Sequence, residues 1–358
     1  MDHKILISKL NYYAIRGTML DWLKDYLSNK IQYTSMSADC KSGPMTVTCG
    51  VPQGIVLGPI MFLIYVNDFA NVCNASKIRL FADDTNIFLV NSDLHLLNND
   101  CNKALEEVSN WMLANRLSIN LEKTNYMLFS PFKHDVKVDN IKLVLNGVEL
   151  VKTNCVKYLG VLIDDRLKWR DQIKSVYNSV MKYVGIFYKL RYKLSQACLK
   201  NLYFATVYPS LQYGIELYEN TNKTFINDLM VLNNKILRIL QIQPLTCNVK
   251  ELYRRYNTLP INELHTLKIA LLMHKYFAHN EILPKIFQNY FTINSTVHSY
   301  CTRTQTNIHL ERFSTKFGAR CLNFYASKIW NSIPTNIKLI SLIKKFKAEL
   351  SLLYLNST

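Results

Sequence analysis

Two consecutive acidic residues, Asp83 and Asp84, stand between apolar segments of the kind that form strands. Residues 77–90 therefore predict a β-hairpin with the two acids at its tip. Two carboxylates held this close together repel each other unless a cation shares them. Mg²⁺ is the hard cation that a few carboxylates and phosphate oxygens bind. The pair predicts a magnesium site, and a solvated hairpin tip is the alternative.

The elements that must position these acids follow from the hydrophobic periodicity. Apolar residues recur at helical spacing over 93–114, and Asn146-Gly147 is a strong signal for a tight hairpin turn. The other predicted helices cover residues 5–10, 19–27 with Thr18 as N-cap, 56–69, 169–187, 195–207, 222–242, 261–278, 319–330 and a basic C-terminal segment. Strands are predicted within 30–49 and at 126–129 and 156–163, whereas 289–312 reads as a loop or weak strands. The order is α+β first and all α afterwards.

Composition excludes several classes of protein. The chain has 358 residues, 49% of them hydrophobic, so it can bury sizeable cores. Its longest apolar stretch, residues 55–66, is shorter than the roughly 20 residues of a membrane span, so no membrane partner is expected. The nine cysteines and eight histidines show neither paired zinc-site spacing nor an HExxH motif. We expect an intracellular protein, in the cytoplasm or nucleus.

The net charge of +17 is distributed unequally. Residues 1–171 contain 19 basic and 18 acidic residues, whereas residues 172–358 contain 24 basic and 8 acidic residues. Lys and Arg that neutralise phosphates release counterions, so such a block favours a polyanion partner. A merely soluble basic surface is the alternative.

An ordered series of motifs surrounds the acidic pair. A Pro-Gln-Gly turn opens a predicted helix, and Phe-Ala-Asp-Asp, Asn-Leu-Glu-Lys-Thr and Lys-Tyr-Leu-Gly follow at residues 50–59, 81–84, 120–124 and 157–160. This series resembles the palm of reverse transcriptases from non-LTR retrotransposons, close to the jockey-like and LINE-like group. Weaker resemblance to the thumb and tail of such elements continues at residues 208–214 and 322–334.

The resemblance implies a role for each matching residue. Asp83 and Asp84 match the catalytic acidic pair that holds two Mg²⁺ ions during phosphoryl transfer from dNTPs. Lys123 matches a position that protonates or neutralises pyrophosphate. The turn residues Pro52, Gln53, Gly54 and, beside the acids, Ala82 match the nucleotide- and template-binding positions. Tyr158, Leu159 and Gly160 match the primer grip, a hairpin that holds the primer end. If the chain is not a polymerase, Gln53 would belong to a capping turn and Lys123 would be a solvated side chain. Tyr158 and Leu159 would then pack in the core.

Two departures from the family pattern bear on activity. Ile55 stands where the family usually has Ser, which removes a potential helix N-cap. The first palm motif resembles residues 2–6 only at its end, so its metal-binding Asp is expected about nine residues before Asp2 and thus before Met1. Asp2 itself is a poor substitute because it lies beyond the strand that presents that Asp. The resemblance therefore implies an N-terminally truncated polymerase without fingers, inactive by itself.

The predicted organisation has three parts. Residues 1–168 correspond to a partial palm, in the family an antiparallel sheet with helices, 169–285 to a helical thumb-like region and 286–358 to a basic tail. The resemblance implies an RNA template, a DNA primer and dNTPs as partners. The alternative function is a noncatalytic RNA- or DNA-binding protein that keeps the palm as a scaffold.

Overall fold

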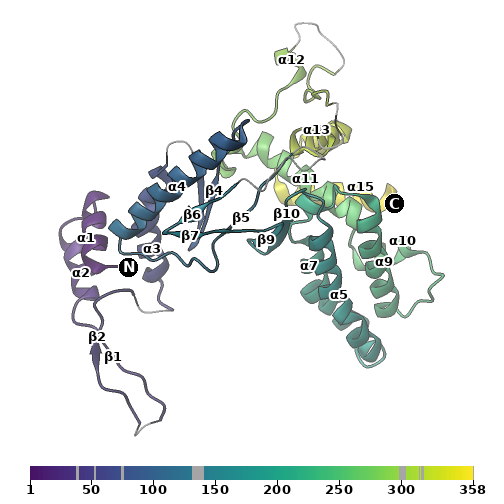
Figure 1. The fold of residues 1–358 in the computed structure, drawn as a ribbon. Helices are drawn as coiled ribbons and strands as arrows, with labels where there is room; N and C mark the ends of the chain where they lie inside the picture. Colours follow the sequence, from purple (N-terminus) through teal and green to yellow (C-terminus); the bar gives the residue numbers. More distant parts are fainter. Residues whose placement is uncertain are drawn as a thin grey trace. The chain divides into compact units, whose positions relative to one another are not determined.

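The structure is a computed structural model that describes residues 1–37, 40–51, 54–73, 76–130, 141–297, 304–313, 315 and 318–357. The chain divides into two compact units, residues 1–154 and 155–358, which are described separately (Figure 1). Helices and strands mix in the first unit, and the second begins with two strands and is otherwise built of helices. The α+β class is therefore confirmed.

Three helices form the first core of the N-terminal unit. They are α1 (His3–Tyr12), α2 (Thr18–Leu27) and α3 (Leu57–Val66). Leu6, Leu23 and Tyr65 are among the side chains buried where these helices pack. The prediction of Thr18 as N-cap is wrong, because Gly17 occupies the cap position at φ +62° and Thr18 already belongs to the helix. Glycine takes this backbone conformation without steric cost.

A β-hairpin follows, built from β3 (Lys77–Phe81) and β4 (Asp84–Phe88), as predicted. The strands pair antiparallel from Lys77 opposite Phe88 to Phe81 opposite Asp84. Ile78 is buried with residues of α4 (Leu94–Ala114) and of the 3₁₀ helix η1 (Asn67–Asn71). The apolar face of the hairpin thus packs on α4 and η1.

The opposite side of α4 holds the strands that precede the second unit. Two asparagine side chains of α4 accept hydrogen bonds from the backbone of this segment. Lys142 N donates to Asn98 Oδ1 at 3.0 Å, and Val144 N donates to Asn102 Oδ1 at 2.9 Å. The short hairpin of β6 (Val144–Leu145) and β7 (Val148–Glu149) is aligned on the helix in this way. Its turn has both Asn146 and Gly147 at positive φ, as the sequence predicts.

The remaining strands of the first unit are short. β1 (Ile31–Gln32) pairs antiparallel with β2 (Met45–Thr46), and β5 (Asn125–Tyr126) pairs parallel with β8 (Val151–Lys152). The strand predicted over 126–129 is thus limited to its beginning. Within the described residues every strand ladder is two-stranded.

The prediction of one strand over 156–163 is wrong. Two strands, β9 (Cys155–Tyr158) and β10 (Val161–Asp164), pair antiparallel around a two-residue turn. Leu159 and Gly160 both have positive φ, at +45° and +83°, and such a backbone reverses the chain. Apolar β-branched residues stand on both sides of the turn, so the pattern of side chains along the sequence resembles one continuous strand.

Helices dominate the second unit. α5 (Arg170–Leu190) packs along α9 (Lys223–Leu240), and α11 (Ile261–Ala278) packs against α13 (Leu322–Ser332) and α15 (Ile343–Ser357) (Figure 1). The predicted helices are confirmed with small shifts in their ends. Further helices of this unit are α6 (Gln196–Leu202), the π-helix η3 (Tyr203–Val207), α7 (Tyr208–Gln212), α8 (Ile215–Tyr218), α10 (Val249–Tyr256) and α14 (Thr335–Lys338). The sequence analysis missed α7, α8, α10 and α14, which are short.

The region predicted as a loop or weak strands is largely irregular where the structure describes it. Ile293 forms an isolated antiparallel bridge with Ile308, and α12 (Asn294–Val297) adds one helical turn. Residues 280–282, 285–287 and 318–320 form 3₁₀ turns. None of the helices in the described residues has the length and apolar character needed to cross a bilayer.

A buried polar network lies inside the helical unit. Tyr203 Oη donates to Asn233 Oδ1 at 3.1 Å, and Asn233 Nδ2 donates to Tyr253 Oη at 3.0 Å. Tyr253 Oη in turn donates to Asn234 Oδ1 at 2.7 Å. Burial raises the pKa of both phenols, so they remain neutral donors. The network joins η3, α9 and α10.

This network yields a matched pair of predictions. Tyr203→Phe should lower the free energy of unfolding by about 1–3 kcal/mol, because Asn233 Oδ1 loses its donor in a buried setting. Tyr256→Phe is the control: the Tyr256 hydroxyl is buried and has no hydrogen-bond partner in the described part, so its removal should cost close to nothing. Urea unfolding followed by circular dichroism measures both. Equal losses in the two variants would contradict the assignment.

Candidate functional site

The acidic pair lies where the β3–β4 hairpin reverses. Asp83 is the second residue of the two-residue turn, and Asp84 is the first residue of β4, opposite Phe81. Both carboxylates are exposed, and Phe81 beside them is 59% exposed. Ala82, the first turn residue, has a φ of +51°, which is unfavourable for a residue with a Cβ atom. Retained backbone strain of this kind is common at functional sites.

The donor set at the turn suits Mg²⁺ in kind, because carboxylate oxygens are its preferred protein ligands. Within the described residues, however, no group of three or more His, Cys, Asp or Glu is gathered for a metal ion. Asp2 is engaged elsewhere: its side chain accepts from the backbone N–H of Ile5 and Lys4 at the start of α1, and Arg116 Nη1 lies 2.6 Å from Oδ2. The Ile5 N–H and then Arg116 lower the pKa of Asp2. Within the described residues, the turn therefore offers a metal ion two carboxylates, those of Asp83 and Asp84, and no third acidic group beside them.

The Pro-Gln-Gly turn is described only in part. Pro52 and Gln53 lie outside the described residues, so their predicted roles stay predictions. Gly54 has a φ of +84°, and a Cβ atom there would meet no atom of the described residues within 4 Å. Open space beside a glycine backbone permits close approach of another molecule. Helix α3 begins after this turn with Val56 at the cap position and no side-chain cap, so Ile55 is not the residue that occupies the cap.

Lys123 lies in a compact turn of its own. The Lys123 N–H donates to Asn120 Oδ1 at 3.2 Å, and Thr124 Oγ1 donates to the Asn120 carbonyl at 2.8 Å. The side chain of Lys123 is exposed. These contacts fix the turn, and the role of Lys123 toward pyrophosphate stays a prediction.

The Tyr158-Leu159-Gly160 turn belongs to the helical unit and is anchored within it. Tyr213 Oη donates a hydrogen bond to the Leu159 carbonyl oxygen. A Cβ atom on Gly160 would approach Tyr213 Cε1 to 3.2 Å, and one on Gly214 would approach Val161 Cγ2 to 3.0 Å. Only glycines fit this close without movement. The two motifs around residues 158–160 and 208–214, separate in the sequence, thus form one packed cluster.

Tyr213 is a residue whose position sequence reasoning missed. The motif that contains it was recognised, but nothing in the chain pattern shows that its hydroxyl reaches a turn 54 residues away. The hairpin has two further anchors: Leu162 N donates to Gln172 Oε1 at 2.9 Å, and Asp164 accepts from the backbone N–H of Trp169 at 2.7 Å. The hairpin is therefore tied to the start of α5 as well as to α7.

The C-terminal end of α5 combines cations with exposed aromatic rings. The Arg191 guanidinium carbon lies 3.9 Å from the ring centre of Tyr188 and 4.6 Å from that of Tyr192. These rings are 54% and 70% exposed, and Lys189 and Lys193 beside them are exposed as well. Exposed aromatic faces and Arg planes stack on nucleobases, while lysines neutralise phosphates. We call these five residues the α5 end cluster.

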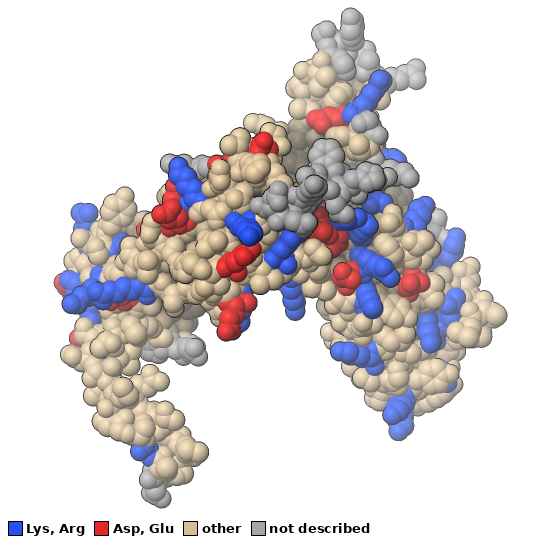
Figure 2. All heavy atoms as spheres, in the orientation of Figure 1, with Lys and Arg blue, Asp and Glu red and all other residues tan. Residues whose placement is uncertain are grey.

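Figure 2 shows many Lys and Arg side chains on the visible face of the helical unit and few Asp or Glu side chains among them. The picture agrees with the charge count along the sequence, which gives 24 basic and 8 acidic residues in 172–358. A surface of one sign attracts polyanions over distances of about a Debye length, roughly 10 Å at moderate salt.

Comparison with known proteins shows which proteins the first part of the chain is similar to. Residues 1–163 match the family described as reverse transcriptase (RNA-dependent DNA polymerase). The matched region contains the acidic turn, the Gly54 turn, Lys123 and the whole β9 strand with its turn. This part of the chain is therefore similar to reverse transcriptases.

Individual relatives show which mobile elements have polymerases similar to this chain. The chain is 29% identical over 221 residues to the RNA-directed DNA polymerase from mobile element jockey of Drosophila funebris, covering 59% of this chain and 24% of the relative. It is 24% identical over 242 residues to the protein of the same description in Drosophila melanogaster, covering 65% and 26%. For the probable RNA-directed DNA polymerase from transposon BS of Drosophila melanogaster the identity is 26% over 298 residues, covering 76% and 30%.

The resemblance to jockey-like, non-LTR reverse transcriptases that the motifs indicate is therefore confirmed. The chain spans between about a quarter and a third of the length of these relatives.

The anchored hairpin generates a prediction with an internal control. Gly160→Ala should lower the free energy of unfolding by about 1–2 kcal/mol, because alanine is strained at φ +83° and its Cβ crowds Tyr213. Gly185→Ala, in the middle of α5 with nothing within 4 Å of the added Cβ, should raise stability by about 0.5–1 kcal/mol. Thermal unfolding of the two variants measures the difference. A stabilising Gly160→Ala would show that the hairpin is not held against Tyr213.

Proposed function

We propose that this chain provides part of the palm, and the thumb, of an RNA-directed DNA polymerase of a non-LTR retroelement. The observation that carries the proposal is the match of residues 1–163 to reverse transcriptases together with an acidic pair presented at a hairpin turn. In this proposal residues 1–168 act as the palm region, 169–285 as the thumb and 286–358 as a basic tail. Its substrates are an RNA template, a DNA primer and dNTPs.

Asp83 and Asp84 supply two carboxylates for Mg²⁺ in this proposal, because they are exposed, adjacent and free of helix-capping contacts of the kind that engage Asp2. Bound Mg²⁺ would supply the positive charge that phosphoryl transfer needs at the primer end. Gln53 and Gly54 line the incoming nucleotide and template, Lys123 neutralises pyrophosphate, and the Tyr158-Leu159-Gly160 turn supports the primer. The anchoring of that turn by Tyr213 supports the last assignment, since a grip must be rigid.

Primer extension tests this proposal. With an RNA template, a DNA primer, Mg²⁺ and dNTPs, we expect no processive synthesis by residues 1–358 alone, because an in-line transfer needs carboxylates from two strands and the acidic turn supplies two from one. Mn²⁺ binding, followed by electron paramagnetic resonance, should nevertheless be weakened in Asp83→Asn and in Asp84→Asn.

Glu149→Gln provides the matched control, since it removes one exposed negative charge on β7, on the opposite side of α4 from the acidic hairpin, and should leave Mn²⁺ binding unchanged. Unchanged Mn²⁺ binding in both aspartate variants would contradict the metal-site assignment. Robust dNTP incorporation that disappears in Asp83→Ala would show that a further acid completes the site and that the chain is active.

We infer a second function, binding of single-stranded nucleic acid without catalysis, from the α5 end cluster. The Arg191 guanidinium lies close to both exposed tyrosine rings, and the cluster belongs to the stretch 172–358 that carries most of the excess charge of the chain. Stacking on exposed aromatic side chains contributes about 1–3 kcal/mol per base, independent of sequence. This function requires no third carboxylate, and the palm then serves as a scaffold.

Binding to a fluorescent single-stranded oligonucleotide at several salt concentrations tests this function. Affinity should fall with a slope of about −0.7 per neutralised phosphate in a plot of log K against log[salt]. Tyr192→Ala should weaken binding about fivefold or more with the slope unchanged, whereas the double variant Lys189→Gln, Lys193→Gln should reduce the slope. Tyr12→Ala, 83% exposed on α1, is the control and should bind like the parent chain. Equal affinities for Tyr192→Ala and the parent would place the interface elsewhere.

A further inference from the structure

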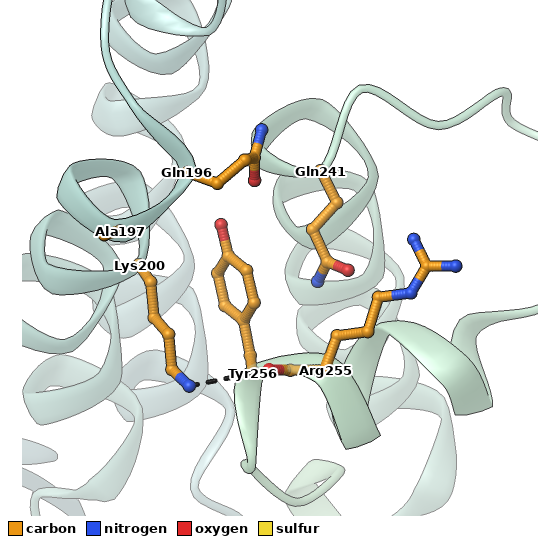
Figure 3. Close-up of a pocket in the computed structure, with 6 residues that line it drawn as sticks. All are labelled: Gln196, Ala197, Lys200, Gln241, Arg255 and Tyr256. Carbon is orange, nitrogen blue, oxygen red and sulfur yellow. Dashed lines mark hydrogen bonds between the residues drawn. The ribbon is translucent and has the colours of Figure 1, made fainter.

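A cavity of about 430 Å³ opens between three helices of the helical unit. α6 contributes residues from its first turns, Gln241 follows the last turn of α9, and α10 contributes its C-terminal end. The lining residues are Gln196, Ala197, Lys200, Gln241, Arg255 and Tyr256 (Figure 3). The volume falls within the range of about 300–1,000 Å³ that is typical of small-molecule sites.

The lining is cationic and contains no carboxylate of its own. Lys200 Nζ lies 3.5 Å from the Arg255 carbonyl oxygen and 5.9 Å from the ring centre of Tyr256. Arg255 is exposed, and its Nη2 lies 3.3 Å from Glu251 Oε2 on the preceding turn of α10, so one acidic group stands nearby. Two cations on one opening favour an anionic group.

Two buried polar atoms of the lining lack hydrogen-bond partners in the described part of the chain. They are the Tyr256 hydroxyl and Gln241 Oε1, on side chains that are 4% and 7% exposed. The Gln241 amide nitrogen donates to the Leu252 carbonyl at 2.9 Å, which leaves its oxygen as an acceptor. Figure 3 shows the Tyr256 hydroxyl pointing toward Gln196, with Lys200 and Gln241 on opposite sides of the ring. Buried polar atoms without partners cost free energy that a ligand can recover.

The Tyr256 hydroxyl is a donor at neutral pH, because burial raises the pKa of this phenol to about 12. The unsatisfied set is thus one donor and one acceptor beside two cations. A fully ionised anion such as sulfate offers acceptors only and leaves Gln241 Oε1 unsatisfied, whereas a neutral sugar or base leaves the cations without a partner. A nucleotide meets both requirements, since its phosphate is anionic and its base or sugar offers donors and acceptors.

We propose that this cavity binds one phosphate-bearing nucleoside unit, with the phosphate at Lys200 and Arg255 and the base or sugar against Tyr256 and Gln241. The unit is either a free nucleotide or one nucleotide of a bound strand, because both present the same groups. In the second case the inference rests on the proposed nucleic-acid binding and gives it a location outside the α5 end cluster.

Binding of deoxyadenosine 5′-monophosphate, adenosine and a single-stranded oligonucleotide to the full chain tests the proposal. Tyr256→Phe should weaken binding of the nucleotide or the oligonucleotide about fivefold to tenfold, through loss of one buried hydrogen bond. Lys200→Gln should weaken binding of the phosphate-bearing probes by a similar factor and leave adenosine unaffected. Lys235→Gln, an equal loss of charge at an exposed position on α9 away from the cavity, is the control.

The outcomes separate the two sources of the ligand. Binding of the free monophosphate that both variants weaken identifies a nucleotide site, and an effect confined to the oligonucleotide identifies a strand contact. If the parent chain binds an oligonucleotide and both variants bind all probes equally well, the cavity proposal is wrong while nucleic-acid binding stands. If the parent chain binds none of the probes at low salt, both proposals fail.

Discussion

The placement of the acidic pair depends on the register of one hairpin. In β3 and β4 the residues Ile78, Leu80 and Ile87 share the face that packs toward α4 and η1, and the alternation of side chains then puts Asp84 on the opposite face with Phe81. A slip of one residue would turn Asp84 toward the apolar core and Ile87 toward water. Burial of the apolar face therefore holds two mutually repelling carboxylates in the open.

Helix α4 makes this arrangement possible because it packs on both sides. One side buries Ala104 and Val108 against the hairpin, and the other presents Leu105 to the 141–150 segment. Asn98 and Asn102 hold that segment by amide hydrogen bonds instead of through another strand. The capping carboxylate of Asp93, whose pKa is lowered by the Leu96 and His95 N–H groups, fixes where the helix begins. A single helix thus packs against both the acidic hairpin and the 141–150 segment.

The helical unit differs in that its interior contains polar groups, some of which have hydrogen-bond partners within the described residues and some of which do not. Tyr203, Asn233 and Tyr253 satisfy one another inside an otherwise apolar core. Tyr256 lies against Tyr203, with ring centres 5.9 Å apart, and its hydroxyl faces the cavity region instead of the network. The contrast between a satisfied and an unsatisfied phenol in neighbouring positions is what distinguishes a structural group from a candidate ligand-binding group.

The sequence by itself determined the features that depend on near neighbours along the chain. Helical periodicity located α4, α5, α9 and α11, the Asn146-Gly147 pair located a turn, and strand-forming segments around Asp83-Asp84 located the acidic hairpin. The ordered motifs also indicated the reverse transcriptase family, because motif spacing is itself a property of the sequence. These features arise from local sterics and from the periods of the two regular structures.

Only the tertiary structure decided which distant residues meet. The turn at Leu159-Gly160 is anchored on Tyr213, and this contact depends on packing between residues 54 positions apart in the sequence. The cavity is assembled from α6, α9 and α10, and α10 is too short for its periodicity to stand out. Such contacts are set by how apolar faces pack in three dimensions, and no local pattern encodes them.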